Sequence, residues 1–349
     1  MKNNIRTKIE QNFFGKLRFC TPGHKGGISV PDSLFCYTEH NEISYRYNYD
    51  VTEIEGQFPL DAITQAEQKT AKLLNVPHLR FLVNGSSIGI KASLLSLGKN
   101  SGDILTTKNV HPAILHSAIL LGVKIFYTDS DYPDKGEIIS AFKKYPSIQT
   151  VVLTSPDYYG VTIDKEVGQV VVEGGKKLFV DAAHGAHFLF RPDLFDCGLF
   201  NYAFAFNLSA HKTLPSLTQT AYLVVSDEKY LDDIDKSLEI LGTTSPSYPF
   251  YMSLEEAADY TYTYKSRYDE LYQAITLFNQ KVPCIQNNDF TRLVVDAVAL
   301  KTDGKTLFQK LLHKGIIPEK YDERFIIFIV SIMDTKETLE ELCKRILEN

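Results

Sequence analysis

The stretch Lys177–His187, KLFVDAAHGAH, joins a short apolar run to a carboxylate and two histidines. The run KLFV has the length and composition of a buried strand, and Asp181 follows it directly. In open α/β sheets, ligands bind beyond the carboxyl ends of the strands. A carboxylate that points into such a crevice needs a cationic partner. The stretch therefore predicts a strand that presents Asp181 at a binding crevice.

Further strand-like runs lie on both sides of this stretch, and helical patterns separate several of them. The runs are RFLV (80–83), DILTT (103–107), VKIFYT (123–128), TVVLTS (150–155), YAFAF (202–206) and TAYLVV (220–225). Strands that alternate with helices predict an α/β fold with a mostly parallel central sheet flanked by helices.

The pattern changes after about Asp227. A long Tyr-rich helical region is predicted over 254–280, followed by a strand at 292–298, a helix at 305–314, a strand from Phe325 and a last helix. Asp334, with Glu337 three residues later, predicts the cap of that helix. We therefore expect an N-terminal segment and large domain over 1–235, and a smaller α+β C-terminal domain over 236–349 that includes the connecting helix.

Composition excludes several classes of partner. The 349 residues are 44% hydrophobic and carry a formal net charge of −6 without a basic block, so nucleic acid is not an expected partner. The longest apolar run, Phe325–Met333, is shorter than the roughly 20 residues of a membrane helix. The polar N-terminus predicts no secretory signal, and five scattered cysteines predict reduced thiols in a cytoplasmic protein.

Two serines follow the run RFLV in the sequence Asn84-Gly85-Ser86-Ser87. Gly85 permits a tight turn, and the free N–H groups at the start of the next helix favour an anion such as a phosphate. An ordinary Ser cap is the alternative. The P-loop pattern is absent.

Three other groups stand near predicted strand ends. The Asp181 carboxylate could pair with a protonated ring nitrogen, and the alternative is that it only caps a helix. Lys212, in SAHKTLPSLTQ (209–219), could form a Schiff base with a carbonyl, unless it is a solvated lysine. His111, before Pro112, could lay its ring over a planar ligand or simply begin a helix. A metal is not expected, because His184 and His187 have no third ligand at a typical spacing. Together these groups are the parts of a pyridoxal phosphate site.

The chain resembles the Orn/Lys/Arg decarboxylase family, of the pyridoxal-phosphate-dependent fold type I (aspartate aminotransferase-like) enzymes. The resemblance rests on TPGHKGG, DVTEIEG, FLVNGSSIGIKA, NVHPAILHSAILLGV, TSPDYYGV, VDAAHGAHFLF, SAHKTLPSLTQTAYL and LGTTSPSYPFYMSLE, which run from about residue 19 to 256, and on GIIPEKYDERFIIFIVSIMDTKETLEEL beyond them.

The resemblance implies pyridoxal phosphate as cofactor and a role for each candidate. Lys212 would hold the cofactor as a Schiff base, Asp181 would keep the pyridine nitrogen protonated, and His111 would stack on the ring. Ser86, Ser87, Ser209 and His211 would surround the phosphate, and His184 would lie beside the cofactor. Thr244, in the segment 243–245, would reach a partner's cofactor, which implies a homodimer or larger homo-oligomer.

The chain departs from the family pattern at a few places. Gln57-Phe58-Pro59-Leu60 stands where GLDDL is common, and Ala182 stands where an acid is common. Family members usually carry a further C-terminal domain, which the 349 residues do not include. These departures leave substrate recognition open.

The expected reaction is decarboxylation of lysine, ornithine or arginine to an amine and CO2. His184 or Lys212 would return a proton to the substrate carbon. The alternatives are transamination or elimination on the same site, with Arg292 or Arg324 as the carboxylate anchor, and a non-catalytic cofactor-binding protein. Candidate acids for the distal amine are Glu53, Glu55 and Asp157.

Overall fold

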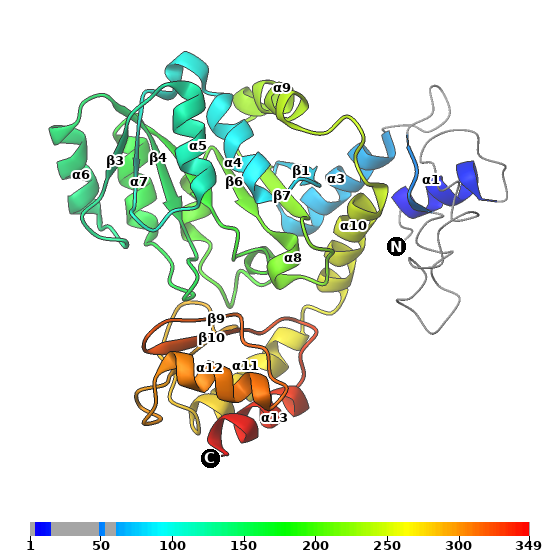
Figure 1. Cartoon of the computed structure of the whole chain (residues 1–349). Helices are drawn as coiled ribbons and strands as arrows, with labels where there is room; N and C mark the ends of the chain where they lie inside the picture. The colour runs from blue at the N-terminus through cyan, green and yellow to red at the C-terminus, as the bar shows by residue number, and fades with distance from the viewer. Residues whose placement is uncertain (1–3, 15–48, 53–60, 349) are drawn as a thin grey trace.

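The computed structural model describes residues 4–14, 49–52 and 61–348. It comprises a large unit built on a seven-stranded sheet and a smaller C-terminal unit built on a three-stranded sheet, with helix α10 (Tyr248–Thr263) leading from one to the other (Figure 1). The predicted α/β class with a smaller α+β C-terminal domain is confirmed. The predicted division after residue 235 falls inside α9 (Leu231–Leu241) and stays a prediction.

The large sheet has the strand order β1-β7-β6-β5-β4-β2-β3. Its strands are β1 (His78–Leu82), β2 (Asp103–Thr106), β3 (Ile125–Tyr127), β4 (Ile148–Thr154), β5 (Lys177–Asp181), β6 (Ala205–Leu208) and β7 (Ala221–Val225). Strands β3, β2, β4, β5 and β6 are parallel, and only β7 runs antiparallel to its neighbours β6 and β1. As a result, β1, β2, β4, β5 and β6 all end at the same edge, which we call the carboxyl edge.

Helices cover both faces of this sheet (Figure 1). The helices of the large unit are α1 (Asn4–Phe13), α3 (Asp61–Leu74), α4 (Ser86–Leu95), α5 (Pro112–Leu121), α6 (Lys135–Lys144), α7 (Lys165–Glu173), α8 (Ala210–Thr213) and α9. Neighbouring residues of β4 contribute to two separate apolar clusters. Val152 lies in one cluster with Ile88 of α4 and Ile114 of α5, and Val151 lies in the other with Val167 of α7. Burial on both faces explains why the central strands are continuous apolar runs.

The small sheet is antiparallel, in the order β8-β10-β9. Its strands are β8 (Arg292–Asp296), β9 (Lys320–Tyr321) and β10 (Phe325–Ile329), and its helices are α11 (Arg267–Asn279), α12 (Gly304–His313) and α13 (Lys336–Leu347). Helices α11 and α13 contact each other, and α12 packs on β10. No helix in the described part of the chain is long and apolar enough to span a membrane.

Three local predictions are corrected. The helical region over 254–280 is two helices, α10 and α11, which a turn at Tyr264–Ser266 separates. The strand placed at 202–206 begins only at Ala205, because a 3₁₀ turn over Gly198–Tyr202 precedes it. Thr335, not Asp334, caps α13: its hydroxyl accepts from the Thr338 amide, while the Asp334 carboxylate accepts from Ser331.

Candidate active site

The predicted site residues gather at the carboxyl edge. Asp181 is the last residue of β5 and pairs in register with Asn207 of β6. Beyond the end of β6, Ser209 precedes the short helix α8, which carries His211 and Lys212. Because β5 and β6 are adjacent and parallel, Asp181 and Lys212 lie at the same end of the sheet. Their charges act on each other across this space.

Lys212 is closely coupled to His184, which follows β5. The Lys212 Nζ lies 3.1 Å from Nε2 of His184. Burial lowers the pKa of Lys212 below its ordinary value, although the charge of Asp181 opposes that change. Burial, with the positive charges of Arg292 and Lys212, holds the pKa of His184 well below its usual range. His184 is therefore neutral at physiological pH, and Lys212 has the environment of a reactive amine.

Asp181 is positioned by two hydrogen bonds to one of its oxygens. Oδ1 accepts from Nδ2 of Asn207 at 3.0 Å and from the backbone N–H of Ala183 at 3.3 Å. Asn207 was missed by the sequence analysis, which considered residues after strands rather than inside them. Both bonds involve Oδ1, so Oδ2, which makes no hydrogen bond to the described residues, is left to face a ligand.

Ser86 and Ser209 meet across the start of α4. Their hydroxyl oxygens lie 2.5 Å apart, and both side chains are buried. Ser86 is the first residue of α4, after Gly85 with φ +77°. This positive φ is a backbone conformation that glycine adopts without strain. Ser87 follows on the same first turn, so the free N–H groups of a ten-residue helix and two hydroxyls converge on one place.

His111 and His211 are both held through their Nδ1 atoms. Nδ1 of His111 accepts from the backbone N–H of Ala113, so His111 caps α5 as its position before Pro112 predicts. Burial lowers the pKa of His111, and the nearby charge of Asp181 opposes that shift. Nδ1 of His211 lies 2.8 Å from the carbonyl oxygen of Thr220. In both residues Nε2 is the atom left to face a ligand.

Arg292 and Tyr158 join the site from other parts of the chain. Nη2 of Arg292, at the start of β8, lies 3.2 Å from Nδ1 of His184 and donates to its carbonyl oxygen, also at 3.2 Å. The rings of Tyr158 and His184 lie 4.4 Å apart, and the Tyr158 hydroxyl donates to Glu319 at 2.8 Å. Sequence analysis considered Arg292 only as a carboxylate anchor, because its contact with His184 arises from the packing of the small unit on the large one. It missed Tyr158, which follows β4 beside β5.

Other predicted residues lie elsewhere. Thr243 and Thr244 are exposed between α9 and α10, where Thr243 lines a separate cavity of ≈340 Å³ with Glu67 and Arg80. Asp157 is buried and accepts from the Tyr132 hydroxyl and two backbone N–H groups. The motif at 21–27, Glu53, Glu55, Cys20, Cys36 and 57–60 lie outside the described residues.

His187, the second histidine of the opening stretch, is a structural residue. Its Nε2 lies 3.1 Å from Oδ1 of Asp289 and 3.2 Å from the hydroxyl of Thr291, all three buried. Within the described ranges, no group of three or more His, Cys, Asp or Glu side chains is arranged to hold a metal ion. The His-Lys pair at 313–314 ends α12, where Lys314 donates to two carbonyls of the C-terminal segment.

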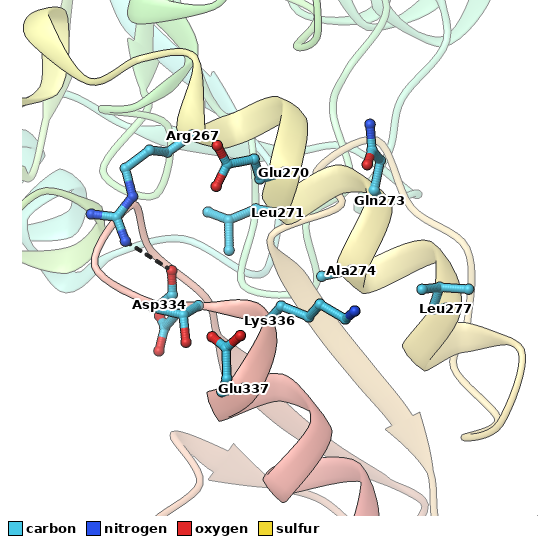
Figure 2. Close-up of a pocket in the computed structure, with 10 residues that line it drawn as sticks. Arg267, Glu270, Leu271, Gln273, Ala274, Leu277, Asp334, Lys336 and Glu337 are labelled. Carbon is cyan, nitrogen blue, oxygen red and sulfur yellow. Dashed lines mark hydrogen bonds between the residues drawn. The ribbon is translucent and has the colours of Figure 1, made fainter.

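A different pocket lies on the small unit, between α11 and the start of α13 (Figure 2). It has a volume of ≈450 Å³, and Nη2 of Arg267 donates across it to the carbonyl oxygen of Asp334 at 3.5 Å. Glu270, Lys336 and Glu337 on its rim are exposed. None of the residues at the carboxyl edge lines it, so it is not part of the candidate site.

The residues at the carboxyl edge fit pyridoxal phosphate. The start of α4 suits the phosphate, and the unbonded oxygen of Asp181 suits the protonated ring nitrogen. The half-buried amine of Lys212 suits the carbonyl carbon of that cofactor. The ring of His111 is close enough for its titration to respond to both Asp181 and Lys212. None of these groups alone is specific for pyridoxal phosphate, but their convergence at one edge of the sheet is.

Comparison with known proteins gives the same family. Residues 9–303 match the family described as Orn/Lys/Arg decarboxylase, major domain. The chain is similar to the uncharacterized protein YaaO of Bacillus subtilis, at 27% identity over 95% of this chain and 74% of the relative. It is also similar to an arginine decarboxylase of Bacillus cereus, at 25% identity over 71% of this chain and 56% of that protein.

Among solved structures, the lysine decarboxylase LdcF of Francisella novicida has the same fold. The TM-score is 0.82 at 18% identity, and the match covers 99% of this chain and 59% of that one. The chain thus spans less than two thirds of the length of these two decarboxylases. With a family match over most of its residues, the chain belongs to the Orn/Lys/Arg decarboxylase family, and so to the enzymes that use pyridoxal phosphate.

Proposed function

We propose that this chain removes CO2 from a basic amino acid, lysine, ornithine or arginine, and releases the corresponding amine. The observation that carries the proposal is the half-buried amine of Lys212, whose pKa burial lowers, near Asp181 at the carboxyl edge. A lysine in this position can lose its proton and bond to a carbonyl, which an exposed lysine does slowly at neutral pH.

When bound, pyridoxal phosphate accepts the electron pair that the departing CO2 leaves behind. Each residue of the chain then has a separate task. Lys212 would supply the amine that holds the cofactor, and Oδ2 of Asp181 would accept a hydrogen bond from the protonated ring nitrogen. Ser86, Ser87 and Ser209 would donate to the phosphate. His111 would cover the ring, and His211 would bind the phosphate through Nε2.

We propose that His184 and Lys212 together return a proton to the substrate carbon. His184 is neutral, it lies 3.1 Å from the Lys212 amine, and the ring of Tyr158 packs on it. A neutral imidazole is too weak an acid to protonate carbon by itself, because it would become an anion. Lys212, in its ammonium form during the reaction, would therefore be the proton donor, and His184 would position it.

A basic substrate is supported by the charges around Lys212. Besides Asp181, Glu319 is the carboxylate that most raises the pKa of this lysine, so its charge reaches the site. Glu319 lies just before β9, holds the Tyr158 hydroxyl and is otherwise exposed. We propose that it binds the distal cation of the substrate. Glu319→Gln is expected to raise KM for the preferred basic amino acid about tenfold with little change in kcat. An unchanged KM would exclude this role for Glu319.

Transamination is the second candidate, and Arg292 favours it. Nε and Nη1 of this buried arginine have no partner among the described residues, so they are free to hold a substrate carboxylate. The two reactions differ in product. The purified chain with pyridoxal phosphate should be incubated with each basic amino acid, and CO2, amine and keto acid measured. Amine with CO2 supports the proposal, and keto acid supports transamination. A cofactor absorption band without any product would identify a non-catalytic protein.

A homodimer or larger assembly is proposed on the surface of the same unit. Ile119 and Leu120 of α5 and Ile240 of α9 are exposed to 76%, 59% and 80%. Apolar side chains grouped on helices that pack against α4 are typical of an interface. Light scattering of the purified protein should give a mass at least twice that of the chain, and a monomeric mass would contradict the proposal.

A further inference from the structure

The guanidinium of Arg292 and the ring of His184 form a buried pair that the proposed reaction does not by itself explain. Arg292 is 2% exposed, and its Nη2 lies 3.2 Å from Nδ1 of His184. The same nitrogen donates to the carbonyl oxygen of His184, which fixes the guanidinium against the ring from two directions. An arginine has only donors, so Nδ1 of His184 must be the acceptor in this pair.

The acceptor role of Nδ1 decides where the proton of the ring lies. In a neutral imidazole one nitrogen accepts and the other carries the proton, so His184 carries its proton on Nε2. A doubly protonated ring is excluded because it would place two donors against each other beside Arg292. Burial and the charge of Arg292 disfavour that form as well, since both lower the pKa of His184.

The proton on Nε2 in turn decides the state of Lys212. The two nitrogens lie 3.1 Å apart, and Nε2–H can only donate. A lysine accepts a hydrogen bond only as the free amine, because an ammonium group has no lone pair. The reverse arrangement, in which an ammonium donates to Nε2, would require a proton on Nδ1 opposite a donor of Arg292.

We propose that Arg292 is a positioning residue that selects the Nε2–H form of His184 and thereby keeps Lys212 as a free amine, ready to bond to the cofactor. This inference rests on the proposed role of Lys212. The other ionisable groups that act on Arg292, His184 or Lys212 are Asp157, Asp181, Asp289, Glu319, His111, His187, His211 and Tyr158.

The first test is nitrogen NMR of the full chain, labelled at histidine and free of cofactor. We expect the resonances of His184, assigned by their loss in His184→Gln, to show a protonated Nε2 and an unprotonated Nδ1 at pH 7. A proton on Nδ1, or a doubly protonated ring, would overturn the inference. This measurement requires no change at Arg292, so it decides the point even if variants there do not fold.

The second test measures the reactivity of Lys212 with acetic anhydride as a function of pH, read by mass spectrometry of the peptide. Arg292→Met is expected to raise the pH midpoint of the Lys212 reaction by about one unit, and His184 should no longer be held in its Nε2–H form. Arg292→Lys keeps a charged donor and is expected to keep both the midpoint and the Nε2–H form. Arg191→Met is the matched control: Arg191 is also buried but binds Asp193 and Asp269, so its loss should leave the midpoint unchanged.

Two results would contradict the inference in this test. An unchanged midpoint in Arg292→Met would show that Arg292 does not control Lys212. A raised midpoint with an unchanged His184 tautomer would assign the effect to the charge of Arg292 alone. Neither measurement uses substrate or cofactor. A result that contradicts this inference can therefore be distinguished from a negative result in the decarboxylation assay.

Discussion

The carboxyl edge of the large sheet and the pocket between α11 and α13 contain the same kinds of residue in opposite settings. Both combine carboxylates with a lysine and a helix N-terminus. At the carboxyl edge Lys212 is largely buried, and burial has lowered its pKa. In the pocket of Figure 2, Lys336 is exposed and lies 3.6 Å from Glu340, one helical turn away.

The difference shows that the types of residue present do not by themselves identify an active site here. In the pocket on the small unit, Glu270, Lys336 and Glu337 on the rim are exposed, so water can solvate their charges. At the carboxyl edge the fold removes water from an amine and an imidazole without giving either a full counter-charge. Such groups are costly to bury, and they become useful when a ligand completes the site.

Removing the amine of Lys212 should have the largest effect. Lys212→Ala is expected to abolish both turnover and the absorption band of the bound cofactor, because the variant lacks the amine that would bond to the cofactor. Lys314→Ala, in the structural His-Lys pair, is the control and should keep both. A variant without Lys212 that keeps the band would refute the assignment.

Loss of Asp181 should come next. Asp181→Ala is expected to reduce turnover about 1000-fold, since the ring nitrogen of the cofactor would lose the charge that stabilises it. Asp157→Asn is a matched control at the end of the neighbouring strand β4, where the carboxylate holds Tyr132 and a turn. Steady-state rates for the two variants should differ by at least two orders of magnitude, and near-normal activity of Asp181→Ala would disprove its role.

A third prediction concerns Glu67 on α3, a buried carboxyl away from the proposed chemistry. Burial raises its pKa to about 7, and this outweighs Arg80, whose Nη1 lies 3.9 Å away. A raised carboxyl pKa means that stability is highest at low pH and falls as pH rises from about 4.5 to 7. Glu67→Gln should therefore raise the free energy of unfolding at pH 8 by up to about 3 kcal/mol and change it little at pH 4.5.

Urea unfolding at the two pH values checks the effect of Glu67. Exposed Glu173, changed to Gln, is the control and should give no pH-dependent difference. Equal stabilisation of Glu67→Gln at both pH values would show that packing, not ionisation, is responsible.

The smallest effect is expected in the pocket on the small unit. Replacing both Glu270 and Lys336 by Gln should change turnover by less than about twofold and stability by less than about 0.5 kcal/mol, because both side chains are exposed. A large loss of activity would show that the two regions are coupled, and it would contradict the conclusion that the pocket is not part of the active site.

The fold class was predictable because the period of the apolar residues reflects burial. Runs such as TVVLTS lie between two layers of helices, and this position requires continuous apolar sequence. Boundaries were less predictable. The break between α10 and α11 contains neither Gly nor Pro, and its one sequence signal is Ser266, the N-cap of α11, with Asp269 and Glu270 in the first turn after it.

By itself the sequence determined which side chains lie at the strand ends. Ser86, His111, Asp181 and Lys212 each lie at or shortly after the end of a strand, as predicted. It also determined the family, through motifs that hold these residues in one order. Only the tertiary structure decided which groups act on one another. Arg292 is 108 residues from His184 along the chain, and their contact depends on how the small unit packs against the carboxyl edge. Protonation states follow from such contacts and from burial, and neither is encoded in local spacing.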